Sequence, residues 1–251
     1  MQTTGVDQSL KLYAELLKLP TFAHLDDPVS RFQSGQSLKE FVLQLMQHEY
    51  ENRPEKARQR RLKTAHFPML KTLEEFDLSR LRHISPDFIR QLASCEFIGR
   101  HENIVMVGNP GTGKTHLMTA IGIKACLWGY KVGSSSGLPQ HWSLSLEKQR
   151  IVYSLRKLEK SIAAADLLLL DELSYASYGL EESELLFKVI AERSERTSTI
   201  ITTNLEFSKW PEMFKDATLV AALEDRLTYH SHILNMNGES YRFQNARKRK
   251  S

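Results

Sequence analysis

Eight consecutive residues, Gly108 to Thr115, constrain the fold of this chain more than any other feature. They read G-N-P-G-T-G-K-T, which has the G-x-x-x-x-G-K-T spacing of a phosphate-binding loop. The apolar run Ile104 to Val107 before them is of strand type, and His116 to Trp128 after them is an apolar-periodic helix that ends at Gly129. In such a loop, backbone N–H groups turn inward around an anion and the helix N-terminus adds partial positive charge. The alternative is a chance glycine turn between a strand and a helix.

The side chains at the end of this loop carry its expected chemistry. Lys114 can reach the β- and γ-phosphates of a nucleotide, and the Thr115 hydroxyl can hold Mg²⁺. The residues expected to bind the nucleotide through this loop are Gly108, Asn109, Pro110, Gly111, Thr112, Gly113, Lys114 and Thr115.

Two acidic residues follow a second apolar strand. Leu167 to Leu170 reads as a buried strand, and Asp171 and Glu172 come directly after it. A carboxylate at the carboxyl end of a buried strand beside a phosphate loop suits Mg²⁺, so we assign Asp171 to the metal together with Thr115. Glu172 points elsewhere and could orient or deprotonate an attacking water. The alternative is a simple acidic strand end.

Asn204 closes a third apolar strand, Thr199 to Thr203. Its amide could hydrogen-bond both the γ-phosphate and the attacking water and so act as a polar sensor. An asparagine at the end of a strand is also common turn chemistry, so both interpretations stay open.

Several arginines could stabilise charge on a transferring phosphoryl group. Arg226 lies in the helical stretch Ala222 to Leu227 and could be given in trans by a neighbouring subunit; the alternative is a salt bridge with Glu224 or Asp225. The other candidates are Arg193 and Arg196, for the same role or for DNA contact, and Arg242, which could touch the nucleotide.

The chain from about Phe88 alternates between helix and strand, beginning with an expected helix from Phe88 to Phe97. This alternation predicts an α/β fold with a parallel sheet flanked by helices. The segment Lys131 to Gln149 should supply another strand and helix, but Gly133 to Pro139 is poor strand material. Three explanations stay open for it: a loop, a strand that forms despite weak propensity, or a short reading-frame slip in the coding DNA.

The part before this alternation looks helical. It contains an apolar-faced helix that stops at Pro20, a second helix with capping-box spacing at Ser37 to Glu40, and a basic stretch, Arg53 to Lys63, in which Pro54 suits a first helical turn. That stretch is either a solvated helix face or a contact to the phosphate backbone of DNA. We therefore predict a helical DNA- or partner-binding domain over residues 1–66 and the nucleotide-binding domain over 67–251, joined by a linker with apolar anchors from Phe67 to Pro86.

Composition narrows the remaining function classes. The chain has 251 residues, 41% of them hydrophobic, and a formal net charge of +4, a mild basic bias that is compatible with a nucleic-acid partner. Two cysteines suggest neither a disulfide framework nor a zinc site. Because no apolar run approaches a membrane span and no signal peptide opens the chain, we expect a cytoplasmic protein without a membrane partner.

The motifs G-N-P-G-T-G-K-T, L-L-L-L-D-E, I-I-T-T-N, L-E-D-R-L and G-E-S-Y-R, in this order, resemble the AAA+ ATPases of the DnaC/IstB group. The stretch from Phe67 to Phe243 is more similar to the IstB transposition helpers of insertion sequences than to the DnaC-type helicase loaders. The resemblance implies a P-loop NTPase fold without a C-terminal helical lid, with ATP and Mg²⁺ as cofactors. It also implies a role for each matching residue: Lys114 and Thr115 on phosphates and Mg²⁺, Asp171 on the metal, Glu172 as catalytic base, Asn204 as first sensor and Arg226 as arginine finger.

From these motifs we expect an ATPase that binds double-stranded DNA, forms a homo-oligomer with ATP between subunits, and recruits or activates the transposase of its element. The alternative that keeps the same motor is a loader of a replicative helicase. A small-molecule P-loop kinase is disfavoured because Asp171 and Glu172 with a later polar sensor suit attack by water. A nucleotide-binding scaffold without turnover is the fourth possibility.

Overall fold

The computed structural model describes residues 5–25, 32–81, 83–134, 162–173, 180–212, 214 and 216–241. The chain divides into two compact units, Met1–Arg60 and Arg61–Ser251. The assignment of DNA or partner binding to residues 1–66 stays a prediction. No helix among the described residues has the length and apolar content to cross a bilayer.

The first unit is helical, as expected. It contains α1 (Gly5–Leu16), the short helix η1 (Pro20–Ala23) and most of α2 (Leu38–Thr64). The capping box before α2 forms as predicted, because the Ser37 N–H donates to Glu40 Oε2 at 2.8 Å and the Glu40 N–H donates to Ser37 Oγ at 3.3 Å.

Pro54 is not in a first helical turn, which corrects the sequence interpretation. It lies inside the single continuous helix α2. A proline there removes one backbone hydrogen bond, to the carbonyl of Tyr50 four residues earlier. Tyr50 is 79% exposed, so water can satisfy that carbonyl and the helix continues.

The second unit is built on a five-stranded sheet in the order β2-β3-β4-β1-β5. All four strand pairs are parallel, and this confirms the α/β class predicted from the alternating pattern. The strands are β1 (Asn103–Val107), β2 (Val132–Ser134), β3 (Leu167–Leu170), β4 (Ser198–Thr203) and β5 (Ser231–Asn235).

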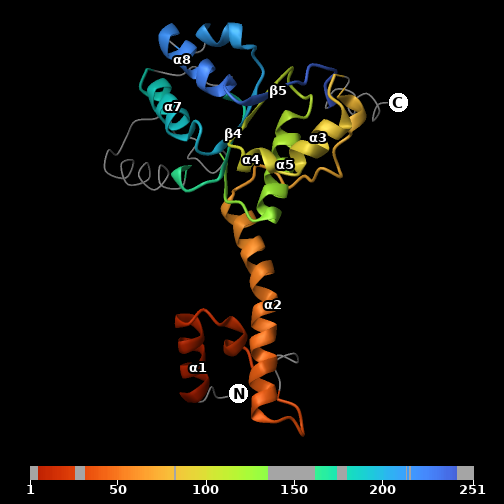
Figure 1. Cartoon of the computed structure of the whole chain (residues 1–251), viewed down its shortest axis with the longest axis vertical. Coiled ribbons are helices and arrows are strands. Elements are labelled where there is room, and N and C mark those ends of the chain that lie inside the picture. The colour runs from red at the N-terminus through yellow and green to blue at the C-terminus, as the bar shows by residue number, and fades with distance from the viewer. Residues whose placement is uncertain are drawn as a thin grey trace, which may run out of the picture. The chain divides into compact units, whose positions relative to one another are not determined.

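Helices cover both faces of this sheet. Figure 1 shows α7 (Leu180–Arg193) and α8 (Ala217–Thr228) on one side and α3 (Pro86–Ala93) and α5 (Lys114–Trp128) on the other. Alternate residues of β3 divide between two cores, since Leu167 and Leu169 belong to the cluster with α5 whereas Leu168 and Leu170 belong to the cluster with α7 and α8. A four-leucine strand is therefore explained by burial on both faces.

The linker after α2 packs against the α5 side of the unit. Its apolar anchors Phe67, Leu73 and Phe76 are partly buried against that core, and it contains the short helix η3 (Leu78–Arg80). The predicted apolar anchors therefore pack against a core, and the segment from Phe67 to Pro86 lies within the second compact unit.

Two elements differ from the sequence interpretation. The helix expected from Phe88 to Phe97 is two helices, α3 and α4 (Glu96–Gly99), because Cys95 between them has a left-handed φ of 64°. The weak segment does form a strand, β2, since its backbone pairs with β3 (Gly133 opposite Leu168), and pairing does not require favourable side chains. The rest of that segment, 135–161, lies outside the described residues.

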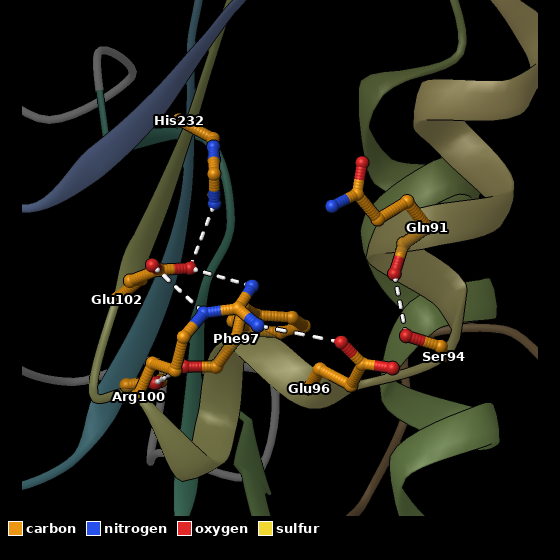
Figure 2. A network of polar contacts seen from close by, with 8 residues as sticks. Gln91, Ser94, Glu96, Phe97, Arg100, Glu102 and His232 are labelled. Carbon is orange, nitrogen blue, oxygen red and sulfur yellow. Dashed lines mark hydrogen bonds and ion pairs between the residues drawn. The ribbon is translucent and has the colours of Figure 1, made fainter.

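The edge of the sheet at which the parallel strands begin carries an ion-pair network (Figure 2). Arg100, after α4, contacts Glu102 at 2.9 Å and Glu96 at 3.3 Å, and Glu102 also contacts His232 of β5 at 2.9 Å. The hydrogen bond from Arg100 is the main cause that lowers the pKa of Glu102. The network connects α4 to Glu102, the residue before β1, and to β5.

Candidate functional site

The predicted phosphate loop connects β1 to α5 and has the backbone shape that its glycines allow. Gly111 and Gly113 have φ values of +82° and +98°, in the left-handed region that residues with a Cβ disfavour. Gly108 has no room for a side chain, because a Cβ there would lie 2.6 Å from the carbonyl carbon of Met236. The glycine pattern is therefore required at these three positions by conformation or by close approach.

Lys114 begins α5 with its side chain folded back toward the loop. It is only 6% exposed, and its Nζ donates to the carbonyl of Asn109 at 2.8 Å and to that of Gly108 at 2.5 Å. The ammonium group thus lies within the curve of the loop, beside the helix N-terminus. This is a concentration of positive charge suited to polyphosphate.

Thr115 and Asp171 come together although they are far apart in sequence. Thr115 Oγ1 donates to Asp171 Oδ1 at 3.0 Å. A hydroxyl and a carboxylate at this spacing are hard oxygen donors, and Mg²⁺ prefers one or two such protein ligands together with phosphate oxygens. The pair therefore fits the metal assigned to it from the sequence.

Glu172 leaves the end of β3 in a different way from Asp171. It is exposed, and its φ of +54° is left-handed, which is uncommon for a residue with a side chain. Its backbone N–H donates to Thr202 Oγ1 on β4 at 2.8 Å. This φ sets the direction in which the Glu172 side chain leaves the backbone, and the role of Glu172 at an attacking water stays a prediction.

Asn204 follows β4, which lies between β1 and β3 in the sheet. The N–H of Gly108 donates to the carbonyl of Thr203 at 3.2 Å, so the residue before Asn204 contacts the start of the phosphate loop. Asn204 thus emerges at the same edge as Lys114 and Asp171, where ligands of open α/β sheets bind.

The C-terminal segment supports the phosphate loop, which the sequence did not reveal. The N–H of Asn109 donates to Asn237 Oδ1 at 3.1 Å, and the N–H of Tyr241 donates to the Gly111 carbonyl at 2.9 Å. The ring of Phe76, from the segment that follows α2, lies next to Gly113. These contacts join residues distant in sequence, and no local pattern marks them.

Arg226 lies away from the phosphate loop of its own chain. It is two residues before the end of α8, and α8 leads into the start of β5 beside the start of β1, whereas the loop follows the end of β1. Its guanidinium donates to the Ala222 carbonyl at 3.1 Å and lies 4.9 Å from the centroid of the Phe187 ring. Between these described residues, the alternative ion pair with Glu224 or Asp225 does not form. A role for Arg226 at a nucleotide would have to be in trans.

The other candidate arginines differ in whether they are accessible to a nucleotide or to DNA. Arg193 is 4% exposed and donates to the carbonyls of Ile162, Ala165 and Ser198 at 2.6, 3.1 and 2.9 Å, so it cannot reach a neighbour's nucleotide or DNA. Arg196 is exposed in the turn before β4. Arg242, predicted to touch the nucleotide, lies outside the described residues.

The arginines in the basic stretch of α2 differ in exposure and in their contacts. Arg58 and Arg60 are exposed, and Arg58 pairs with Glu55 at 3.0 Å. Arg61 is half-buried and donates to the carbonyl of Cys126 in the last turn of α5 at 2.9 Å, where a cation complements the helix dipole. Arg61 therefore has a structural role, whereas Arg58 and Arg60 are exposed, as are the other basic residues of the run, Arg53, Lys56 and Lys63.

Comparison with known proteins places this site in a family. The family model described as "IstB-like ATP binding protein" matches residues 14–249. The chain is 36% identical over 219 residues to the insertion sequence IS21 putative ATP-binding protein of Pseudomonas aeruginosa, covering 84% of this chain and 78% of the relative. It is 32% identical over 246 residues to the IS5376 putative ATP-binding protein of Geobacillus stearothermophilus, covering 94% of each.

Solved structures support the same fold at lower identity. DnaI superposes with a TM-score of 0.51 at 16% identity, covering 68% of this chain and 90% of DnaI. AMPPCP-bound DnaA from Aquifex aeolicus superposes with a TM-score of 0.52 at 20% identity, covering 71% of this chain and 54% of that one. The second unit therefore has the P-loop AAA+ fold.

Proposed function

The chain belongs to the family of IstB-like ATP-binding proteins, and from that premise we propose that it is an ATP-hydrolysing transposition helper. It assembles on double-stranded target DNA in the cytoplasm and recruits or activates the transposase of the same insertion sequence. The observation that carries the hydrolysis part is the hydrogen bond between Thr115 and Asp171 beside the phosphate loop, with Glu172 as the next residue after Asp171.

Each residue of the site has a definite part in that reaction. Lys114 and the loop N–H groups bind the phosphates. Thr115 and Asp171 would hold Mg²⁺, which supplies charge neutralisation to the phosphate oxygens. Glu172 orients the attacking water and accepts its proton, and Asn204 hydrogen-bonds the water and the γ-phosphate.

We assign Arg226 to the nucleotide of a neighbouring subunit in a homo-oligomer. Its position near the opposite edge of its own sheet supports this assignment. A guanidinium supplied in trans makes hydrolysis depend on assembly, so nucleotide state and oligomer are thermodynamically linked.

Nucleotide turnover tests the ATPase proposal directly. Lys114→Ala should weaken nucleotide binding, whereas Glu172→Gln should keep binding and slow hydrolysis by about 10²–10⁴-fold. Lys188→Ala is the matched control, because Lys188 is exposed on α7 and its ion pair with Glu192 is long, at 3.9 Å. Equal turnover by the parent and Lys114→Ala would refute the assignment of the site.

Mixing experiments test the trans role. Arg226→Ala and Glu172→Gln are each expected to be inactive alone. An assembly containing both pairs some intact Glu172 sites with an intact Arg226 from the neighbour, so mixing should restore part of the activity. No recovery on mixing would remove Arg226 from the role of trans arginine.

DNA and protein partners need separate measurements. Reversing charge at Arg58 and Arg60 should lower affinity for duplex DNA and reduce its salt slope by about one for each phosphate that the variant no longer neutralises, with Lys188→Glu as the control. Capture of the element's transposase supports the helper function; capture of a replicative helicase alone would replace it with the loader function.

A further inference from the structure

The hydroxyl of Thr202 lies between the two acidic residues of the site. Thr202 Oγ1 donates to Asp171 Oδ1 at 2.5 Å and accepts the backbone N–H of Glu172 at 2.8 Å. Its side chain comes from β4, the strand next to β3, and the residue is fully buried. One side chain from the neighbouring strand therefore contacts both residues that the hydrolysis mechanism uses.

The direction of these hydrogen bonds is fixed by chemistry. A threonine hydroxyl has one proton, and a backbone N–H can only donate. Thr202 must therefore accept from Glu172, and its own proton is free to go to the Asp171 carboxylate. Asp171 Oδ1 then receives two hydroxyl donors, from Thr202 and from Thr115 at 3.0 Å.

The bond to Glu172 restrains an uncommon backbone conformation. A φ of +54° brings the Cβ of Glu172 close to its own backbone, so this conformation persists where surrounding contacts hold it. The accepted N–H is such a contact. Because φ sets the direction in which the side chain leaves the chain, Thr202 also determines where the Glu172 carboxylate can reach.

We propose that Thr202 is a positioning residue for ATP hydrolysis, whose single hydroxyl orients Asp171 toward the metal and Glu172 toward the attacking water. This inference rests on the proposed ATPase function and refines it. Removal of a hydrogen bond that orients a metal ligand commonly lowers metal affinity or activity by about 10–100-fold.

Neighbouring threonines of β4 have different contacts, so the role is not a general property of the strand. Thr203 Oγ1 donates to the carbonyl of Leu205 at 3.1 Å, and Thr199 Oγ1 accepts from Arg193 at 3.5 Å. Of these three residues, Thr202 is the one that reaches the acidic pair.

The test uses the 251-residue chain and three variants of it. Thr202→Val keeps the branched shape and strand preference but removes the hydroxyl, and Thr202→Ser keeps the hydroxyl. Thr119→Val is the matched control, because Thr119 is a fully buried threonine of α5 whose hydroxyl has no hydrogen-bond partner among the described residues.

We expect Thr202→Val to lower kcat by about 10–100-fold and to raise the half-saturating Mg²⁺ concentration, with little change in KM for ATP. Thr202→Ser should recover most of the rate, and Thr119→Val should match the parent. A second readout does not need turnover: the Mg²⁺-dependent rise in melting temperature with a non-hydrolysable ATP analogue should shrink in Thr202→Val and return in Thr202→Ser.

The outcomes separate this inference from the proposed function. If the parent binds nucleotide but does not hydrolyse ATP, the ATPase proposal fails, and the Mg²⁺-dependent melting shift still decides whether Thr202 orients Asp171. If the parent hydrolyses ATP and Thr202→Val matches Thr119→Val in kcat and Mg²⁺ dependence, the inference is overturned. If Thr202→Val melts below the assay temperature, Thr202→Ala, which also lacks the hydroxyl, is compared with Thr119→Val in kcat and Mg²⁺ dependence at a lower temperature.

Discussion

Replacing Arg193 by alanine should strongly destabilise the second unit. Arg193 ends α7, and its guanidinium is enclosed at the start of β3 and β4, where it donates to the carbonyls of Ile162, Ala165 and Ser198. Burial lowers the pKa of Arg193 to about 10, so the group is still charged at neutral pH. A buried cation whose donors meet three carbonyl dipoles connects a helix to two neighbouring strands.

The magnitude follows from those contacts. Hydrogen bonds that involve a charged group contribute about 1.5–3 kcal/mol each, so three of them are worth roughly 5–9 kcal/mol before costs. Desolvation of the guanidinium opposes this gain by several kcal/mol. Truncation removes both effects but leaves three carbonyls without their donor, and we expect a net loss of about 3–5 kcal/mol in the free energy of unfolding.

Urea unfolding at neutral pH measures this loss of free energy. In thermal unfolding the same loss should lower the melting temperature by roughly 10 °C. Arg196→Ala is the matched control, since Arg196 is exposed three residues later and should change stability by less than about 0.5 kcal/mol. A change below about 1 kcal/mol in Arg193→Ala would refute the argument. So would loss of DNA binding or turnover by a variant as stable as the parent.

Two further substitutions test the loop and the ion-pair network. Gly113→Ala should destabilise the second unit by about 1–3 kcal/mol and weaken nucleotide binding, because φ is +98° and the new Cβ would lie 2.9 Å from Phe76 Cε2. Melting and nucleotide titration measure the two effects, and Gly99→Ala is the control because a Cβ at Gly99 would meet open space. Equal behaviour of the two variants would contradict the strain argument. Because the hydrogen bond from Arg100 lowers the pKa of Glu102 below its ordinary 4.5, the stabilisation from this carboxylate is complete above pH 4.5 and is lost as the pH falls through the lower folded value. Glu102→Gln should therefore cost up to about 1 kcal/mol at pH 7 and progressively less below pH 4.5 in urea unfolding, whereas a difference that does not depend on pH would exclude the carboxylate as its source.

Local sequence patterns were sufficient to predict the phosphate loop and the strand β3, which precedes Asp171. The glycines of Gly108 to Thr115 specify a backbone shape that few other sequences allow, and four consecutive leucines before Asp171 specify a strand buried on both faces. The meeting of Thr115 with Asp171 was also predictable, because parallel strands end at one edge of their sheet.

Other elements escaped local patterns because their stability comes from partners elsewhere in the chain. β2 has glycine and serine in it and is held by pairing with β3. β5 was not predicted because Ser231 to Asn235 contains only two apolar residues, which are adjacent, and this strand is held by pairing with β1. Pro54 suggested the start of a helix, but its neighbours on both sides continue the same one.

The sequence by itself determined that this chain has a strand–loop–helix unit with the spacing of a phosphate-binding loop and an acidic pair after a buried strand, since these features depend on residues adjacent along the chain. Only the tertiary structure decided which polar groups meet across the sheet. It buried Arg193 under three carbonyls, placed Arg226 away from its own loop, and set the Thr202 hydroxyl between Asp171 and Glu172. The reason is physical: hydrogen bonds and burial depend on distances in space, which sheet order and helix packing set and local sequence does not encode.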